Sequence, residues 1–181
     1  MNREEALNLV KKYTSNKNLI KHMLAVEVAM KAYAKRFGED EETWGLCGIL
    51  HDVDYERMGV EHPSAWGQNL LKENCVEEKI IQAILGHGDG KESLRTTNMA
   101  KALFAVDRLS GFIVACALVR PNKLSDVDVE SVKKSMKKKE FAKAIDREEI
   151  NQGAKELGVE LDEHISVVLD AMKSIKGELG L

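Results

Sequence analysis

The chain has 181 residues, 44% of them hydrophobic, and a formal net charge of −3, as expected for one globular domain with a single core. Because acidic residues match the basic ones, the electrostatic attraction that nucleic-acid binding needs is missing, and we predict no nucleic-acid partner. The longest uncharged apolar run, residues 111–119, is far shorter than the ~20 residues of a membrane span, and residues 1–5 lack the apolar segment of a signal peptide. We therefore predict a cytoplasmic protein with no membrane partner.

The sequence favours helices over strands throughout. It contains 2 prolines and 5% aromatic residues, and it is rich in Ala, Leu, Lys and Glu, which have high helix propensity. Apolar residues recur at helical spacing, and no segment shows the alternation of a strand. In chain order the predicted helices cover residues 3–13, 16–37, 40–52, 62–74, 76–86, 98–116, 126–135, 138–157 and 161–177. We therefore predict an all-α fold in a single domain, residues 1–181.

Cap residues define several of the predicted helix ends. Asn16 or Asn18 opens the second helix and Asp40 opens the third. Pro63 suits the first turn of a helix, where its missing N–H costs nothing, so we expect His62 at or next to an N-cap. Glycine caps at helix C-termini are expected at Gly38, Gly158 and Gly177.

The cysteines and one histidine carry no functional signal. The three cysteines are widely spaced in apolar surroundings, which favours reduced core residues over disulfides or a zinc site; they are Cys47, Cys75 and Cys116. His164 lies among acidic residues in the first turns of the last predicted helix. We interpret it as an ordinary surface residue.

Other polar residues interrupt the apolar faces of separate helices. His22, His87 and Asp107 each lie on the core-facing stripe of a different helix, and the pair His51–Asp52 ends a fourth. One buried histidine is usually satisfied by a backbone carbonyl, but several unpaired polar groups would cost several kcal/mol, against a total stability of about 5–15 kcal/mol. Imidazole and carboxylate groups on facing helices are what a divalent transition metal binds. The pattern therefore predicts a metal site.

With their spacing and local contexts, these residues resemble the HD-domain superfamily of metal-dependent phosphohydrolases, in its HDIG-like, six-ligand, dinuclear type. The contexts are Lys21-His22, Ile49-Leu50-His51-Asp52, His62-Pro63, Ile84-Leu85-Gly86-His87 and Val106-Asp107-Arg108-Leu109-Ser110. The resemblance spans residues 22 to about 112. It implies an HD-type bundle of about 8–10 helices, with a metal-binding core at residues 17–116 and a helical extension at residues 117–181.

The resemblance implies a complete set of metal ligands, namely His22, His51, Asp52, His62, His87 and Asp107. In this scheme one ion lies among His22, His51, Asp52 and Asp107, and Asp52 bridges to a second ion held by His62 and His87. Asp52 and His51 would be the catalytic residues. Two divalent ions lower the pKa of a shared water, so that hydroxide attacks a phosphoester or phosphoanhydride in line. The cofactors would be two ions of Fe, Mn, Ni, Co, Zn or Mg.

The implied partner is a small phosphorylated metabolite or a nucleotide. The candidate substrate-binding cations are Arg57, Lys91, Arg95, Arg108 and Lys123. Many relatives have glycine two residues after the aspartate and then a lysine, whereas this chain has Asp54 and Tyr55. A lysine role is therefore not carried over, and a substitute role for Arg57 stays open. For Asp54 we favour a helix cap over an orienting partner of a histidine ligand.

Two other functions share the same residues. HD-type di-iron oxygenases use the same six ligands with dioxygen, and oxygen uptake by reduced, iron-loaded protein would identify that class. A non-catalytic HD module that binds a nucleotide or a partner protein is the third reading. Protein that stays folded without ever taking up metal would favour it. The sequence makes no prediction of the oligomeric state.

Overall fold

The computed structural model describes residues 1–59 and 61–181, and this part of the chain contains helices and no strands. The helices are α1 (Arg3–Tyr13), α2 (Lys17–Phe37), α3 (Glu41–Leu50), α4 (Tyr55–Met58), α5 (Ala65–Glu73), α6 (Glu78–Gly86), α7 (Asn98–Leu118), α8 (Val129–Met136), α9 (Arg147–Leu157), α10 (Leu161–Ser174) and α11 (Lys176–Leu179). Short 3₁₀ turns lie at Gly59–Glu61, Glu92–Leu94 and Lys123–Asp126. Nine of the described helices have eight or more residues. The predicted all-α fold is confirmed.

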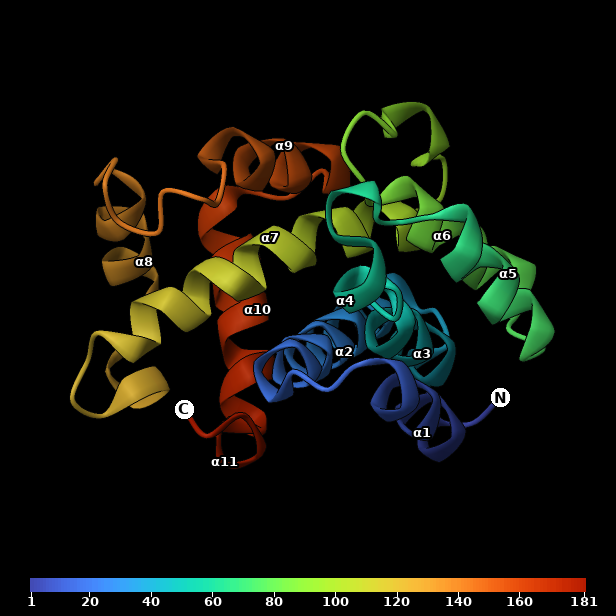
Figure 1. The fold of residues 1–181 in the computed structure, drawn as a ribbon. Helices are drawn as coiled ribbons and strands as arrows, with labels where there is room; N and C mark the ends of the chain where they lie inside the picture. The colour runs from blue at the N-terminus through green and yellow to red at the C-terminus, as the bar shows by residue number, and fades with distance from the viewer.

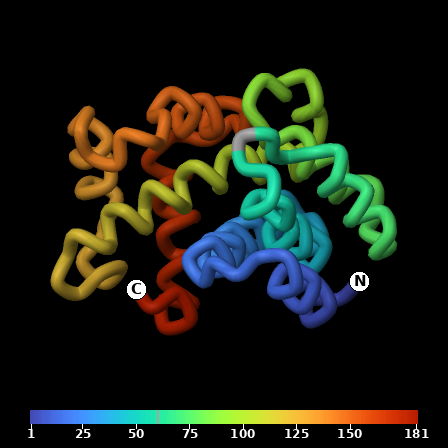
Figure 2. The backbone as a smooth tube through the Cα atoms, in the orientation of Figure 1, coloured from blue at the N-terminus to red at the C-terminus, as the bar shows by residue number. Residues whose placement is uncertain are grey.

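The two longest helices, α2 and α7, form the centre of the bundle (Figure 1). Helix α2 packs against α3, α7 and α10, while α7 also contacts α6 and α9. The chain path in Figure 2 brings the C-terminal helices back against the first half of the chain. One buried apolar cluster contains residues from both parts, such as Met30 and Leu169. The boundaries of one domain at 1–181, with a core at 17–116 and an extension at 117–181, stay a prediction.

None of the helices in the described ranges has both the length and the apolar character that crossing a membrane requires.

Two glycines bring helices close together next to the candidate site. A Cβ atom on Gly48 of α3 would lie 2.7 Å from the Cα of Glu27 in α2. A Cβ on Gly153 of α9 would lie 2.7 Å from the Cα of Ala105 in α7. Such distances do not occur between real Cβ atoms and backbone, so only glycine permits these approaches. The first contact sets the distance between the helices that carry His22 and His51.

Several predicted helix ends are confirmed, and others are corrected. Asn16 and Asp40 are N-caps whose side chains accept backbone N–H bonds, and Gly38 and Gly158 end helices in the left-handed conformation. Gly177 is not a cap: α10 already ends at Ser174, and Gly177 lies within α11, whose C-cap is Gly180.

The helix predicted at residues 62–74 begins later, at Ala65. Its N-cap is Ser64, whose side chain accepts the N–H of Gly67. His62 has an extended backbone because its ring is bonded to Asp54 instead of lying at the helix start. The prediction of His62 as an N-cap is therefore wrong.

The helix predicted at residues 138–157 is also shorter. Residues 137–146 form turns, and α9 begins only at Arg147. The guanidinium of Arg147 donates to the carbonyls of Ala142, Ile145 and Phe141, which compete with helical backbone bonds.

His164 and Cys75 differ from their predicted environments. Cys47 and Cys116 are buried, as predicted, but Cys75 is exposed and has a left-handed backbone. His164 is not a surface residue: its side chain is fully buried between α10, α2 and α7. Its Nδ1 accepts the hydroxyl of Tyr33 at 2.6 Å, and its Nε2 donates to the carbonyl of Ala105 at 3.1 Å. Burial lowers the pKa of His164 to about 4.

We expect Gly48→Ala to lower the free energy of unfolding by about 1–3 kcal/mol, because the added methyl overlaps the backbone of α2. Gly45→Ala, one turn earlier in α3, is the matched control, since the atoms nearest to its Cβ would belong to the long side chain of Lys31 and not to backbone. Urea unfolding of both variants checks this. An equal loss of stability would contradict the packing argument.

The buried His164 also predicts a pH dependence of stability. Its pKa is about 4 in the folded protein and about 6.5 when unfolded, so between these values the unfolded chain binds the extra proton. Stability is therefore fully present above pH 6.5 and falls on acidification, by roughly 3 kcal/mol at pH 4. His164→Gln keeps a donor and an acceptor but has no such titration. Unfolding free energies from pH 7 to pH 4.5 should fall more steeply for wild type, and parallel curves would contradict the assignment.

Candidate metal centre

Six polar side chains from five segments meet beside α7. His22 projects from α2 and Asp107 from the middle of α7, while the other four occupy helix ends or turns. His51 and His87 are the C-caps of α3 and α6. Each turns its ring back so that Nδ1 donates to the carbonyl three residues earlier, at 2.8 Å for His51 and 2.6 Å for His87. The other ring nitrogen, Nε2, is thereby directed away from its own helix.

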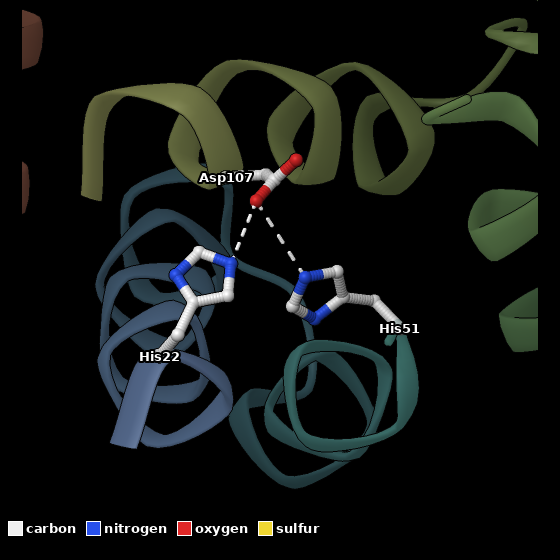
Figure 3. Close-up of side chains that lie close together, drawn as sticks. All are labelled: His22, His51 and Asp107. Atoms are coloured by element: carbon white, nitrogen blue, oxygen red, sulfur yellow. Dashed lines mark hydrogen bonds and ion pairs between the residues drawn. The ribbon is translucent and has the colours of Figure 1, made fainter. Parts of the chain in front are cut away.

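The first group of donor atoms surrounds one oxygen of Asp107 (Figure 3). Asp107 Oδ1 lies 2.8 Å from His22 Nε2 and 3.6 Å from His51 Nε2. Asp52 Oδ2 lies 3.3 Å from His51 Nε2 and 3.7 Å from His22 Nε2. Ligands about 2.0–2.2 Å from a single divalent ion are roughly 3.0–3.5 Å apart. The spacing of this group therefore suits one ion.

The second group gathers around the other oxygen of Asp52. Asp52 Oδ1 lies 2.9 Å from His62 Nε2 and 3.9 Å from His87 Nε2, and these two nitrogens are 2.8 Å apart. The two carboxylate oxygens of Asp52 thus face different sets of histidines. Groups of three donor atoms within 4.8 Å of one another occur at His22, His51 and Asp107 and at His51, Asp52 and His87.

The hydrogen bonds of the histidine rings indicate which ring nitrogens are available to bind a metal ion. Carbonyl oxygens only accept hydrogen bonds, so Nδ1 of His51 and of His87 carries the proton, and a neutral ring then presents a lone pair at Nε2. His62 is oriented in the same way by the carboxylate of Asp54. His51 Nε2 is buried and has no hydrogen-bond partner. Nitrogen lone pairs and carboxylate oxygens directed at one another repel unless a proton or a metal cation lies between them. The donor set therefore fits divalent metal ions.

Comparison with known proteins agrees with this geometry. The sequence model of the HD domain matches residues 19–111, just over half of the 181-residue chain. The chain belongs to the HD-domain family. The resemblance to the HD-domain superfamily is thereby confirmed, and HD domains are in general metal-dependent hydrolases. The six-ligand, dinuclear type stays a prediction.

One curated relative of this HD domain has no described activity. Over 98 residues the chain is 35% identical to an uncharacterized protein of Methanocaldococcus jannaschii. The aligned stretch covers 49% of this chain and 57% of that protein, so the chain spans little more than half of the relative's length. No solved structure matches the chain.

Burial and neighbouring charges shift the pKa values of the clustered histidines and aspartates in different directions. Burial raises the pKa of Asp52 and Asp107, but the adjacent histidines outweigh it and hold both values well below the usual range. Burial lowers the pKa of His51, yet the charge of Asp52 and the contact with Asp107 raise it well above its ordinary value. Burial and repulsion from its histidine neighbours lower the pKa of His87 to about 4. The cluster thus favours positive charge at its centre and neutral imidazole at one edge.

Asp54 orients His62 instead of capping a helix. Its Oδ1 accepts the Nδ1–H of His62, and its Oδ2 accepts the N–H and hydroxyl of Ser64 at 2.8 and 2.6 Å. It makes no side-chain cap bond to α4. A Cβ at Gly67 would lie 2.3 Å from Asp54 Oδ2, so this glycine makes room for the carboxylate. The cap interpretation is corrected; the position of Asp54, two residues after Asp52, was the available sequence signal.

An open cleft of about 370 Å³ gives access to the cluster. Five of the six predicted ligands line it, but His51 does not, because it lies fully buried behind Asp52 and Asp107. The lining residues that sequence reasoning did not single out include Leu19, Tyr55, Asp89, Gly111 and Ile145. Ile145 comes from the C-terminal part of the chain, and no local pattern marks it for the site.

Of the five candidate substrate-binding cations, only Arg108 lines the cleft. It donates a hydrogen bond to Asp89 at 2.7 Å and forms an ion pair with Glu149 at 2.9 Å. Arg95 is buried, lies over the ring of Phe104 and bonds Glu156.

The other three candidates also lie outside the cleft lining. The guanidinium of Arg57 lies 4.5 Å from the ring of Trp66, and Lys123 donates to the carbonyl of Gly180. Lys91 is exposed on the loop after α6. The structure therefore does not bring these three or Arg95 to the cluster.

We expect Asp54→Asn to lower the affinity of the His62–His87 side for metal by about 10–100-fold, because His62 loses the carboxylate that fixes its ring. Glu56→Gln is the matched control: Glu56 accepts bonds from Ser15 and Asn16 and touches no histidine. Elemental analysis after dialysis against defined metal concentrations measures the bound metal. Equal metal content in the two variants would contradict the orienting role.

Proposed function

We propose that this HD domain is a metal-dependent phosphohydrolase that cleaves a phosphoester or phosphoanhydride of a nucleotide or small phosphorylated metabolite. The observation that carries the proposal is the arrangement of Asp52, whose two oxygens face two groups of histidine nitrogens at the base of an open cleft. Membership of the HD-domain family supports the same reaction class.

The residues of the chain have distinct roles in this proposal. His22, His51, Asp107 and Asp52 Oδ2 would hold one divalent ion, and His62, His87 and Asp52 Oδ1 would hold the other. When bound, two such ions lower the pKa of a water molecule and offset the charge on phosphoryl oxygens. The nitrogen and oxygen donors accept Fe, Mn, Ni, Co or Zn, and Mg is the least suited to the histidines.

Asp52 is the residue on which both halves of the site depend. Its carboxylate fixes the spacing of the two groups, and it lines the cleft where substrate enters. His51 has no access to the cleft, so its role in the proposal is to hold metal and not to contact substrate. Arg108 is the candidate cation in the cleft wall, and its N–H groups would bind phosphoryl oxygens there.

The cleft volume limits the substrate. About 370 Å³ is near the lower end of small-molecule sites. It suits a phosphate with one modest organic group.

The test is hydrolysis by protein of known metal content. Anaerobically purified wild type is analysed for metals and then assayed with mononucleotides, dinucleotide polyphosphates and sugar phosphates. Asp52→Asn should lose metal and lower turnover by about 100-fold or more, because several kcal/mol of charge stabilisation disappears. Asp170→Asn on the outer face of α10 is the matched control and should retain both.

Two results would contradict the proposal. The first is metal-replete wild type that hydrolyses none of these phosphates. The second is oxygen consumption by reduced, iron-loaded protein with an organic substrate, which would assign the site to oxygenase chemistry.

A further inference from the structure

Gly111 has no structural explanation within its own helix. It lies one turn after Asp107 inside α7, where glycine costs about 0.5–1 kcal/mol relative to alanine. Its backbone is not left-handed. Gly48 and Gly153 admit a neighbouring backbone, but the nearest atom to a Cβ at Gly111 would be Ile145 Cδ1 at 3.6 Å, an ordinary contact. Neither backbone conformation nor helix packing therefore requires a glycine here.

Gly111 lies where two hollows of the surface meet. One is the cleft over the candidate metal centre, and the other is a groove of about 490 Å³ between α2, α7 and α11. Both are lined by Leu19, His22 and Gly111. A side chain at position 111 would stand between these two hollows, and its absence leaves the space above Gly111 free.

The groove beyond the junction is mainly apolar. Its apolar lining is Leu19, Val114, Leu118, Leu179 and Leu181, and its polar lining is Asn16, Asn18, Lys21 and His22. Leu118, in the groove wall, is 64% exposed. Exposed apolar surface beside a polar site is typical of ligand-binding grooves.

We propose that this groove binds an apolar organic group of the substrate. Gly111 is then the specificity-determining residue that lets this group extend from the metal centre into the groove. The inference rests on the proposed function and narrows it to phosphate esters of apolar alcohols. The phosphate would lie over Asp52 and Asp107, and the alcohol part would cross Gly111 and lie along Val114 and Leu118.

The charges of the groove favour this class over a second anionic group. Among the described residues, Lys21 is the one cation in the groove lining, and Lys123 at its edge is bonded to the carbonyl of Gly180. The described cleft lining also has one cation, Arg108, which is paired with Asp89 and Glu149. A polyphosphate tail would need more positive charge than this path offers.

The test compares methyl, butyl and octyl phosphate as substrates of metal-replete protein. For wild type, kcat/KM should rise about fourfold for each methylene that enters the groove. Gly111→Leu should remove most of the dependence of kcat/KM on chain length, because its side chain closes the junction. Gly111→Ala should fold at least as well as wild type and should reduce this dependence in part. Gly177→Ala in α11 is the matched control, since its Cβ would meet no atom within 4 Å and it lies outside the groove lining.

Binding of octylphosphonate, which is not hydrolysed, gives a readout independent of turnover. Calorimetry should show a negative heat-capacity change with wild type, because apolar surface is buried. Gly111→Leu should reduce it, and Gly177→Ala should not.

The outcomes separate the two proposals. If neither these esters nor the nucleotides and sugar phosphates of the first assay are hydrolysed but octylphosphonate binds in a Gly111-dependent manner, the proposed function fails and the groove assignment stands. Hydrolysis without dependence on chain length or on Gly111→Leu overturns the groove assignment alone. A dimer in solution that Leu118→Asp dissociates would also overturn the groove assignment, because the groove wall would then be an interface between two copies of the chain.

Discussion

The structure depends on the placement of several electron-rich atoms around one small volume. The Nε2 atoms of His62 and His87 are 2.8 Å apart, and the other nitrogen of each ring donates to a carboxylate or carbonyl oxygen. Two carboxylates and two more histidines border the same space. Such an arrangement is unfavourable unless positive charge occupies it. The close contact of α3 with α2 at Gly48 and the buried position of α7 hold these atoms in place against that repulsion.

Much of the fold could be predicted because helical periodicity and caps are local signals. The end of α2 at Gly38 and the start of α3 after Asp40 follow directly from residue chemistry. The errors arose where distant contacts override propensity. Residues 137–146 contain good helix formers, but Arg147 binds the carbonyls that a helix would use. His62 lies before the helix and not at its start, and the sequence pattern did not indicate this because its hydrogen-bond partner, Asp54, is eight residues away.

The structure brings together the candidate metal ligands that the sequence indicates, but it places only one of the candidate substrate-binding cations in the cleft lining. Most candidate ligands interrupt or end apolar stripes, so helical periodicity indicates them, whereas His62 followed only from the family resemblance. Long cationic side chains reach in directions that periodicity does not define, and Arg95 is held over Phe104 by Glu156 instead of entering the cleft. His164 was misjudged because its neighbours in sequence are acidic, while its own face of α10 packs against Tyr33. Ile145 reaches the cleft through tertiary packing alone.

The most direct test of the central claim is anomalous diffraction from crystals of the protein grown with manganese or iron. We predict two peaks about 3.5–4 Å apart, one between His22, His51 and Asp107 and the other beside His62 and His87, with Asp52 between them. Crystals that hold metal elsewhere, or that show well-ordered side chains here with no anomalous peak at saturating metal, would contradict the account.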